Sequence, residues 1–337
     1  MLSKRQNFLE TIRGGKPDRF VNQYEALSLL MGPNYALLDP INGAFPPFIP
    51  DAGPVVGAWG VALEFISGQP GPMPVHTEKY RVLKDITKWK DVVKMPKTDY
   101  PDSAWEEGAK LAASIKEKKE TFAAACYFTG VFERCHYLMG MEDCLCNFYE
   151  EPKLMHELID YITEYELKFA EQLTKHWKPD ALFHHDDWGT QNSTFLSPEM
   201  FHEFIMPAYK KIYKCWKDNG VEVVVHHCDS FAATLVPDMI EMGADVYQGC
   251  MSTNNTPELV KKYGGKISFM GDLDNGVLDK ENWTPDLIKK HVERACRNNG
   301  KLYYIPCLVM GGPGSTYPGV YEEVSKEIDR MSKEMFS

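Results

Sequence analysis

The stretch VEVVVHHCDS, residues 221–230, decides which fold the rest of the chain must fit. Its uninterrupted run of three valines is typical of a parallel strand that is buried on both faces. His, Cys and Asp follow directly at the carboxyl end of this run. Parallel α/β folds carry their functional side chains at that end of the strands. We therefore expect a parallel sheet with a polar site at one edge.

Similar short apolar runs recur from about residue 120 onward and alternate with amphipathic helical stretches. The six runs are residues 122–126, 181–185, 221–226, 244–247, 267–270 and 302–306. The helical stretches between them are residues 152–176, 198–219, 230–242, 257–263 and 284–298. Two of these helices open with a hydroxyl residue followed by proline, Ser197-Pro198 and Thr284-Pro285, which is a helix-start signal. The alternation predicts β-α units with parallel strands.

Two further strands, expected at residues 20–24 and 59–65, bring the number to eight. The predicted fold class is therefore α/β, a (β/α)8 TIM barrel that forms a single domain over residues 1–337. Residues 1–19 are expected to form an N-terminal helical extension. Long loops should cover the C-terminal face, above all the Gly- and Pro-rich segment 32–74 with its FPPFIP motif. A doubly wound open sheet is the alternative, but no Gly-rich dinucleotide or phosphate loop follows the first strand.

The composition excludes several classes of function. The net charge of −11 argues against nucleic acid as a partner, because such binding needs a basic surface. No run of about 18 apolar residues occurs, so no membrane span is expected. The N-terminus carries charges throughout and has no apolar core typical of a secretory signal, so we expect a cytoplasmic protein. In that compartment the nine cysteines are expected to be free thiols.

Three residues form a candidate metal site. Side chains alternate along a strand, so His226 and Cys228 are expected to point the same way and His227 the other way. Cys307 ends the last apolar run, LYYIPC, and would stand across the barrel mouth. One His and two Cys with an open fourth position are a catalytic zinc set. Cysteines that only fill the core fit the same pattern.

Other candidates follow strands or flank the mouth. Asp187, in HHDDWG, and Glu25, after the first expected strand, are candidate catalytic carboxylates that could act as a base or orient a ligand. The preceding His184 and His185 are interpreted as packing or surface groups. Aromatic residues that could line a substrate pocket are Tyr24, Trp59, Tyr127, Trp188 and Tyr317.

Several segments, in this order, resemble the uroporphyrinogen decarboxylase superfamily over nearly the whole chain. They are KPDR (16–19), VFER (131–134), LSPEMFHEFIMPAY (196–209), HHCDS (226–230), MGDLD (270–274) and GGPGSTYPG (311–319). Within that superfamily the chain resembles the zinc-containing, corrinoid-dependent methyltransferases, whose H-x-C pair and distant Cys match His226, Cys228 and Cys307. The Arg-rich loop of the decarboxylases is absent, because FVNQYEALS follows Arg19.

The resemblance implies a zinc-dependent methyltransferase that works with cobalamin. Its methyl group would move between a small methylated compound and the cobalt of a corrinoid carried by a partner protein, since the chain lacks a convincing D-x-H-x-x-G cobalamin motif. The apolar, aromatic pocket candidates favour an O-methyl donor such as a methoxylated aromatic, and hence O-demethylation. The alternatives are a methylcobamide:thiol methyltransferase of the coenzyme M type and a uroporphyrinogen decarboxylase-like enzyme. A corrinoid- or tetrapyrrole-binding protein with a structural zinc is a further alternative.

Overall fold

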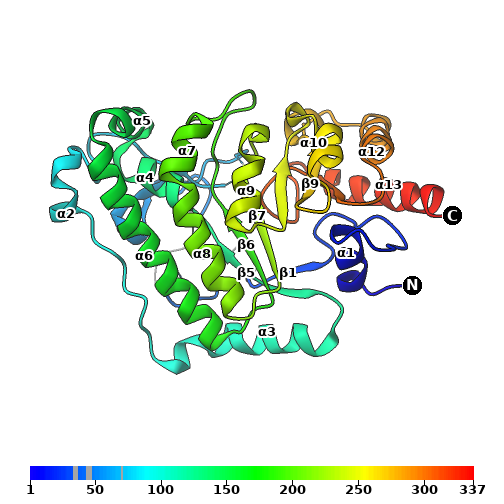
Figure 1. Cartoon of the computed structure of the whole chain (residues 1–337), viewed down its shortest axis with the longest axis horizontal. Coiled ribbons are helices and arrows are strands. Elements are labelled where there is room, and N and C mark those ends of the chain that lie inside the picture. The colour runs from blue at the N-terminus through cyan, green and yellow to red at the C-terminus, as the bar shows by residue number, and fades with distance from the viewer. Residues whose placement is uncertain (33–36, 43–47, 70) are drawn as a thin grey trace.

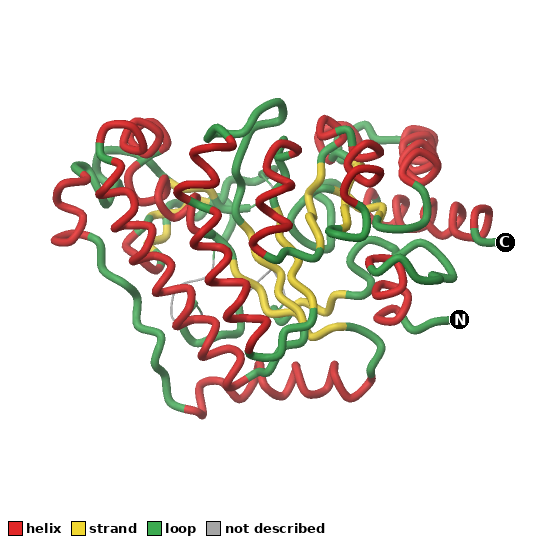
Figure 2. Tube along the Cα trace, viewed as in Figure 1, coloured by secondary structure: helices red, strands yellow, loops and turns green. Residues whose placement is uncertain are grey.

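The centre of the molecule is a curled parallel sheet whose outer face is covered by helices (Figures 1 and 2). The structure is a computed structural model that describes residues 1–32, 37–42, 48–69 and 71–337. All strands of the sheet run parallel, in the order β1-β5-β6-β7-β8-β9-β10. They are β1 (Leu27–Leu29), β5 (Phe122–Tyr127), β6 (Ala181–His185), β7 (Val223–His227), β8 (Val246–Cys250), β9 (Ser268–Leu273) and β10 (Tyr304–Leu308). The β-α alternation of the expected TIM-barrel architecture is confirmed.

Helices follow most of these strands and pack on the outside of the sheet. They are α1 (Lys4–Ile12), α2 (Trp89–Val92), α3 (Glu106–Lys118), α4 (Val131–Met139), α5 (Met141–Glu150), α6 (Pro152–His176), α7 (Pro198–Phe204), α8 (Met206–Asp218), α9 (Val236–Met242), α10 (Thr256–Tyr263), α11 (Asn275–Leu278), α12 (Pro285–Asn299) and α13 (Val320–Met335). The longest, α6, begins at a proline and buries residues spaced by three and four, such as Met155, Ile159 and Ile162. That stripe packs α6 against the sheet layer.

The two early strands of the eight expected differ from the prediction. The first strand of the sheet is β1, which begins three residues after the predicted 20–24. The segment 59–65 does not join the barrel: it starts in a short 3-10 turn and continues as β3 (Ala62–Glu64). Strand β3 pairs antiparallel with β2 (Val55–Val56) and β4 (Met73–Pro74) in a separate small sheet. Trp59 has a left-handed φ of 66° within the 3-10 turn. Because β3 pairs only within the small sheet, the described barrel has seven strands.

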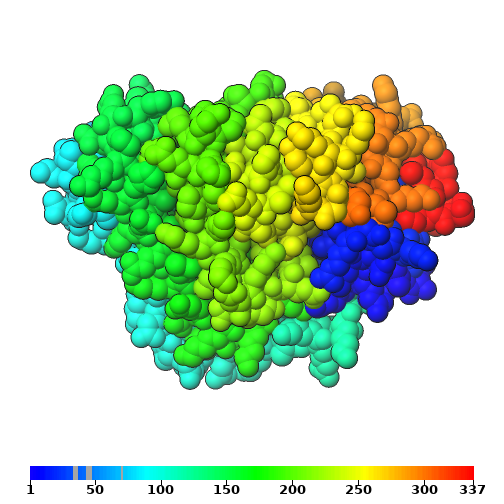
Figure 3. Space-filling view, viewed as in Figure 1, coloured from blue at the N-terminus to red at the C-terminus, as the bar shows by residue number. Residues whose placement is uncertain are grey.

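The chain before β1 spans the gap between β10 and β1. The amide of Leu308 donates to Gln23 Oε1 at 3.3 Å, and the Tyr24 hydroxyl donates to the Met310 carbonyl at 2.8 Å. Helix α1, capped by Ser3, buries Phe8 against the start of β5, as expected of the helical extension. Figure 3 shows this N-terminal segment in blue, packed beside the C-terminal part of the chain in orange and red.

Side chains of the strands alternate between two apolar cores. In β7, Val223 and Val225 point into the barrel, where they pack with Phe183 and Ile305. Val224 belongs to the outer core between the sheet and the helices. This alternation determines on which side of the sheet the two histidines that end β7 lie.

The sequence also predicts a long loop over the barrel mouth and no membrane-spanning helix. The expected loop over the barrel mouth, 32–74, lies partly outside the described residues, and so does half of its FPPFIP motif. In the described part of the chain, no helix has the length and apolar character needed to cross a bilayer.

Candidate metal centre at the barrel mouth

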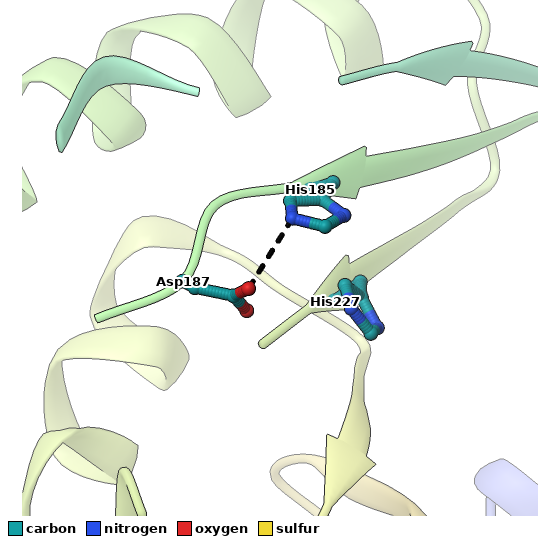
Figure 4. Close-up of side chains that lie close together, drawn as sticks. All are labelled: His185, Asp187 and His227. Carbon is teal, nitrogen blue, oxygen red and sulfur yellow. Dashed lines mark ion pairs between the residues drawn. The ribbon is translucent and has the colours of Figure 1, made fainter. Parts of the chain in front are cut away.

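Three potential metal ligands lie together at the carboxyl ends of two neighbouring strands. His185 ends β6, Asp187 follows it by two residues, and His227 ends β7 (Figure 4). Because β6 and β7 pair with His185 opposite His227, the two imidazoles are neighbours, with ring centroids 4.5 Å apart. One ligand atom from each of the three residues lies within 4.8 Å of the others, the only such group found in the described residues. This edge of the sheet is the functional face of a TIM barrel.

The alternation of β7 puts His227, rather than His226, on the inner side. His227 follows Val223 and Val225 in the inward phase, and its ring stacks on Phe183. His226 points outward: its Nδ1 lies 2.5 Å from the Tyr213 hydroxyl of α8, and its ring stacks on Trp188 at 3.9 Å. As expected, His226 and Cys228 lie on one side of the chain and His227 on the other, but the side of His226 and Cys228 faces the helices and not the barrel mouth.

The structure does not bring His226, Cys228 and Cys307 together. Cys307 belongs to the inner core and Cys228 to the outer one, so the sheet separates their thiols. Cys228 Sγ accepts from the Trp188 amide at 3.3 Å and lies 2.8 Å from Ser230 Oγ. Burial raises the pKa of both thiols well above its ordinary value, so both are protonated at neutral pH. The thiolate zinc set stays a prediction without support from this arrangement.

Two carboxylates face His185. Its Nε2 lies 3.3 Å from Glu133 Oε1 and 3.4 Å from Asp187 Oδ2. Burial by itself lowers the pKa of His185, but the two carboxylates outweigh it and raise that pKa well above 6.5. Burial raises the pKa of Asp187, and the His185 charge reverses this effect and lowers it. Without a metal, His185 and Asp187 are therefore an ion pair at neutral pH.

The other histidine of the group is held neutral and in a fixed orientation. Burial lowers the pKa of His227 to about 4. Its Nδ1 is hydrogen-bonded to Gln248 Oε1, so the proton resides on Nδ1 and the lone pair on Nε2. A bulge in β8 at Gly249, whose φ is +86°, lets this strand approach the backbone of Cys228. Gly311 passes so close that a Cβ there would lie 2.8 Å from His227 Nε2.

A backbone hydrogen bond from the loop after β7 positions the Asp187 carboxylate. Its Oδ1 accepts from the amide of Asp229 at 3.0 Å, which leaves Oδ2 toward His185. The neighbouring Asp186 points to the other side and binds the amides of Phe132 and Glu133 at the start of α4. Of the two adjacent acids, Asp187 is thus the one at the mouth and Asp186 anchors a helix.

The other predicted site residues are distributed around the barrel. Glu25 lies in a surface hollow beside α13 with Asn22 and Asp329, away from the His185 group. Tyr24 packs inside the barrel and binds the Met310 carbonyl, the residue before Gly311. Tyr317 follows β10, where its amide binds Asp279 at 2.8 Å.

The remaining three aromatic residues lie in the outer core. Trp188 stacks on His226 and donates from Nε1 to Asp186 at 2.9 Å. Tyr127 ends β5 and stacks on His184 at 4.9 Å. Trp59 packs edge-on against Tyr165 at 4.9 Å. In the described part of the chain, no hydrogen bond or ring contact joins any of these three residues to His185, Asp187 or His227.

Sequence reasoning did not single out His185 and His227 as candidate ligands. A signal for them existed, since HHDD and HHCD follow two consecutive apolar runs, and consecutive parallel strands are usually neighbours. Two His-His pairs at neighbouring strand ends must place one His of each pair on the inner face, whatever the phase of the strands.

The sequence matches a known family. The family model described as uroporphyrinogen decarboxylase (URO-D) matches residues 54–330. The chain is also similar to a methylated-thiol–coenzyme M methyltransferase of Methanosarcina mazei, with 23% identity over 202 residues. That match covers 59% of this chain and 52% of the relative, so the chain matches about half the length of that protein.

The fold also resembles a solved structure. A methyltransferase from Methanosarcina mazei superposes with a TM-score of 0.64 over 98% of this chain and 99% of the other. The two sequences are 13% identical, so this likeness concerns the fold. The similarity over the full length agrees with the described arrangement of the barrel.

Proposed function

Since the chain belongs to the uroporphyrinogen decarboxylase family, and the relatives above are methyltransferases, we propose that it moves a methyl group between a small compound and a corrinoid held by a partner protein. The observation that carries this proposal is the group of His185, Asp187 and His227 at the functional face of the barrel. Two imidazoles and a carboxylate form a three-ligand set that leaves a position open for substrate.

The donor set fits a zinc-like ion. Imidazole nitrogen suits Zn²⁺, and catalytic zinc sites commonly combine two His with one carboxylate. When bound, such an ion supplies Lewis acidity to the heteroatom that loses or gains the methyl group. Unlike the set expected from the sequence, this one contains no thiolate. The competing prediction is a zinc site formed by His226, Cys228 and Cys307. Substitutions in each of the two sets show which one binds the metal.

The surrounding residues orient the ligands and handle a proton. Gln248 Oε1 accepts a hydrogen bond from Nδ1–H of His227, which leaves Nε2 as the ligand atom. The Asp229 amide turns Asp187 Oδ2 toward the same space. Glu133 Oε1, 3.3 Å from His185 Nε2, can take up the proton that His185 loses when a cation binds and pass it on to solvent. Burial raises the pKa of Glu133, which suits that role.

The methyl donor has two candidates. A methoxylated aromatic is the donor that the sequence favoured through its apolar pocket candidates, although Trp59, Tyr127 and Trp188 lie in the outer core. A methylated thiol is favoured by the name of the relative from Methanosarcina mazei. Both reactions use one Lewis-acid position beside the corrinoid, so the three-ligand set serves either of them.

An assay with free cob(I)alamin tests the proposal. Zinc-loaded protein should convert cob(I)alamin to methylcobalamin with at least one donor from a panel of methoxylated aromatics and methylated thiols. His185→Gln should abolish this conversion, while Cys146→Ser, at an exposed cysteine, should leave it unchanged. Conversion that survives His185→Gln, or no conversion with either donor class, would contradict the proposal. Decarboxylation of uroporphyrinogen would instead assign the chain to the other activity of the family.

A further inference from the structure

Phe128 follows β5 at the barrel mouth and is not part of the candidate metal centre. β5 ends at Tyr127, which belongs to the outer core, so the alternation of the strand turns Phe128 to the inner side, where it packs against the inner core. Its ring centroid lies 5.9 Å from that of His185 and 6.3 Å from that of Phe183. Because β5, β6 and β7 are neighbours, Phe128, His185 and His227 lie in a row across the mouth.

The backbone after β5 holds this ring in place. Thr129, the next residue, has a left-handed φ of 66°, an uncommon conformation for a β-branched residue and one often found at functional sites. Gly130 then begins α4, and its amide donates to the His185 carbonyl at 2.8 Å. A Cβ at Gly130 would lie 2.2 Å from the Tyr209 hydroxyl oxygen and 2.5 Å from Asp186 Cβ. These contacts fix the turn between β5 and α4 and keep the preceding ring beside His185.

Phe128 is also the accessible ring at the metal centre. Two phenylalanine rings contact the His185 group in the described residues: Phe183 stacks on His227, and Phe128 packs against His185. Phe183 lies deeper in the barrel and is 0% exposed, whereas Phe128 is half-buried. The side chains of His185 and Asp187 are 22% and 28% exposed. A molecule that reaches these two ligands from solvent therefore meets the Phe128 ring.

The other sides of His185 are polar. Glu133 Oε1 and Asp187 Oδ2 lie 3.3 and 3.4 Å from its Nε2. Asp229, whose amide binds Asp187, is exposed at the same place. An apolar group that covered these carboxylates would remove their solvation without replacing it, which is costly. The side of Phe128 is thus the one that suits an apolar group of the substrate.

We infer that Phe128 determines the specificity of the proposed methyl transfer, as the wall on which an aromatic group of the methyl donor packs. This inference rests on the proposed function, because it places the methylated heteroatom at the ion held by the His185 group. An aromatic ring bonded to that heteroatom packs against Phe128 in an offset or edge-to-face geometry. A methylated thiol with a short polar chain gains no such contact. Of the two candidate donors, Phe128 therefore favours the methoxylated aromatic.

Binding of anisole, the simplest aryl methyl ether, to the zinc-loaded protein without corrinoid tests the inference. Isothermal titration should give a Kd for Phe128→Ala that is about threefold to tenfold above that of the wild type, the contribution of one aromatic contact. Phe128→Tyr, which keeps the ring, should bind anisole as the wild type does. Phe336→Leu removes a half-buried ring that packs on Phe20 instead, and it should leave the Kd unchanged.

The zinc affinity of the variants separates a substrate wall from a structural role. Phe128→Ala should keep the zinc affinity of the wild type, because Phe128 is not a ligand. If the space left by alanine disturbs His185 and lowers the zinc affinity, Phe128→Leu takes its place in the titration. This variant fills more of the space and should also bind anisole more weakly than the wild type.

Three results would count against the inference or the proposed function. Equal Kd values for anisole in the wild type and in a zinc-binding Phe128→Ala or Phe128→Leu would overturn the inference, and so would a wild type that does not bind anisole. Weaker binding in these variants, together with a wild type that transfers no methyl group, would leave the aromatic wall intact and reject only the proposed function. Methyl transfer from anisole that is equally efficient in the wild type and in Phe128→Ala would keep the proposed function and reject the wall.

Discussion

Gly311→Ala is the substitution whose effect on the candidate metal centre can be worked most directly from the structure. The added Cβ would lie 2.8 Å from His227 Nε2, about 0.6 Å closer than an ordinary contact. Gly311 does not have a left-handed φ, so the alanine backbone itself is unstrained. The clash must be relieved by moving the imidazole or the loop, and ligands need to be held within about 0.5 Å.

The expected loss of zinc affinity follows from this displacement. Disturbing the groups that position a metal ligand typically lowers metal affinity by about tenfold to a hundredfold. The free energy of unfolding of the metal-free protein should fall by about 1–3 kcal/mol, the usual cost of overpacking. Competition with a chromophoric chelator measures the affinity, and denaturant unfolding measures the stability. Gly276→Ala is the matched control, because no atom lies within 4 Å of its added Cβ. Wild-type zinc affinity in folded Gly311→Ala would refute the assignment of His227 Nε2 as a ligand.

Further predictions concern the ligands and the buried histidines. Asp187→Asn should lower the zinc content from about one ion per chain to a small fraction, while Cys307→Ser should keep it; metal analysis of the purified variants decides between the two ligand sets. Zinc binding at pH 7 should release a proton, because the carboxylates raise the pKa of His185 in the metal-free protein; calorimetry in buffers of different ionisation enthalpy measures this release, and its absence would contradict the ion pair. Burial lowers the pKa of His136 to about 3, so the unfolded chain takes up this proton first and stability falls as the pH drops from about 6.5 toward 3. Unfolding of His136→Leu should show a pH slope weaker than that of the wild type by about 1.4 kcal/mol per pH unit in this range, and an unchanged slope would be the contrary result.

Much of the fold could be predicted because the signals were local and agreed with one another. The boundaries of β6 and α6 are as predicted, since a buried apolar run and a proline-led stripe of apolar residues each specify one structure. The early strands were harder to predict. Residues 59–65 are rich in apolar residues and therefore resemble a barrel strand, yet Trp59 has a left-handed φ and packs against Tyr165, a tertiary contact that no local pattern reveals.

The candidate ligand group differs in part from the residues expected from the sequence, and the reason is physical. Both faces of a barrel strand are buried, so the three valines of β7 carry no polar alternation that would fix its phase. The burial pattern alone therefore does not distinguish whether His226 or His227 faces the barrel. Asp187, which lies outside the strand proper, was identified as the carboxylate that could reach the mouth, and it does lie beside His185.

X-ray absorption of the zinc-loaded, full-length protein tests the proposed metal centre most directly. Zinc bound by His185, Asp187 and His227 should show a first shell of nitrogen and oxygen alone, at about 2.0–2.1 Å. The thiolate set of Cys228 and Cys307 would add sulfur scatterers at about 2.3 Å, a difference that the spectrum resolves. A shell without sulfur is the predicted result, and a shell with two sulfurs would show that the metal lies with the cysteines instead.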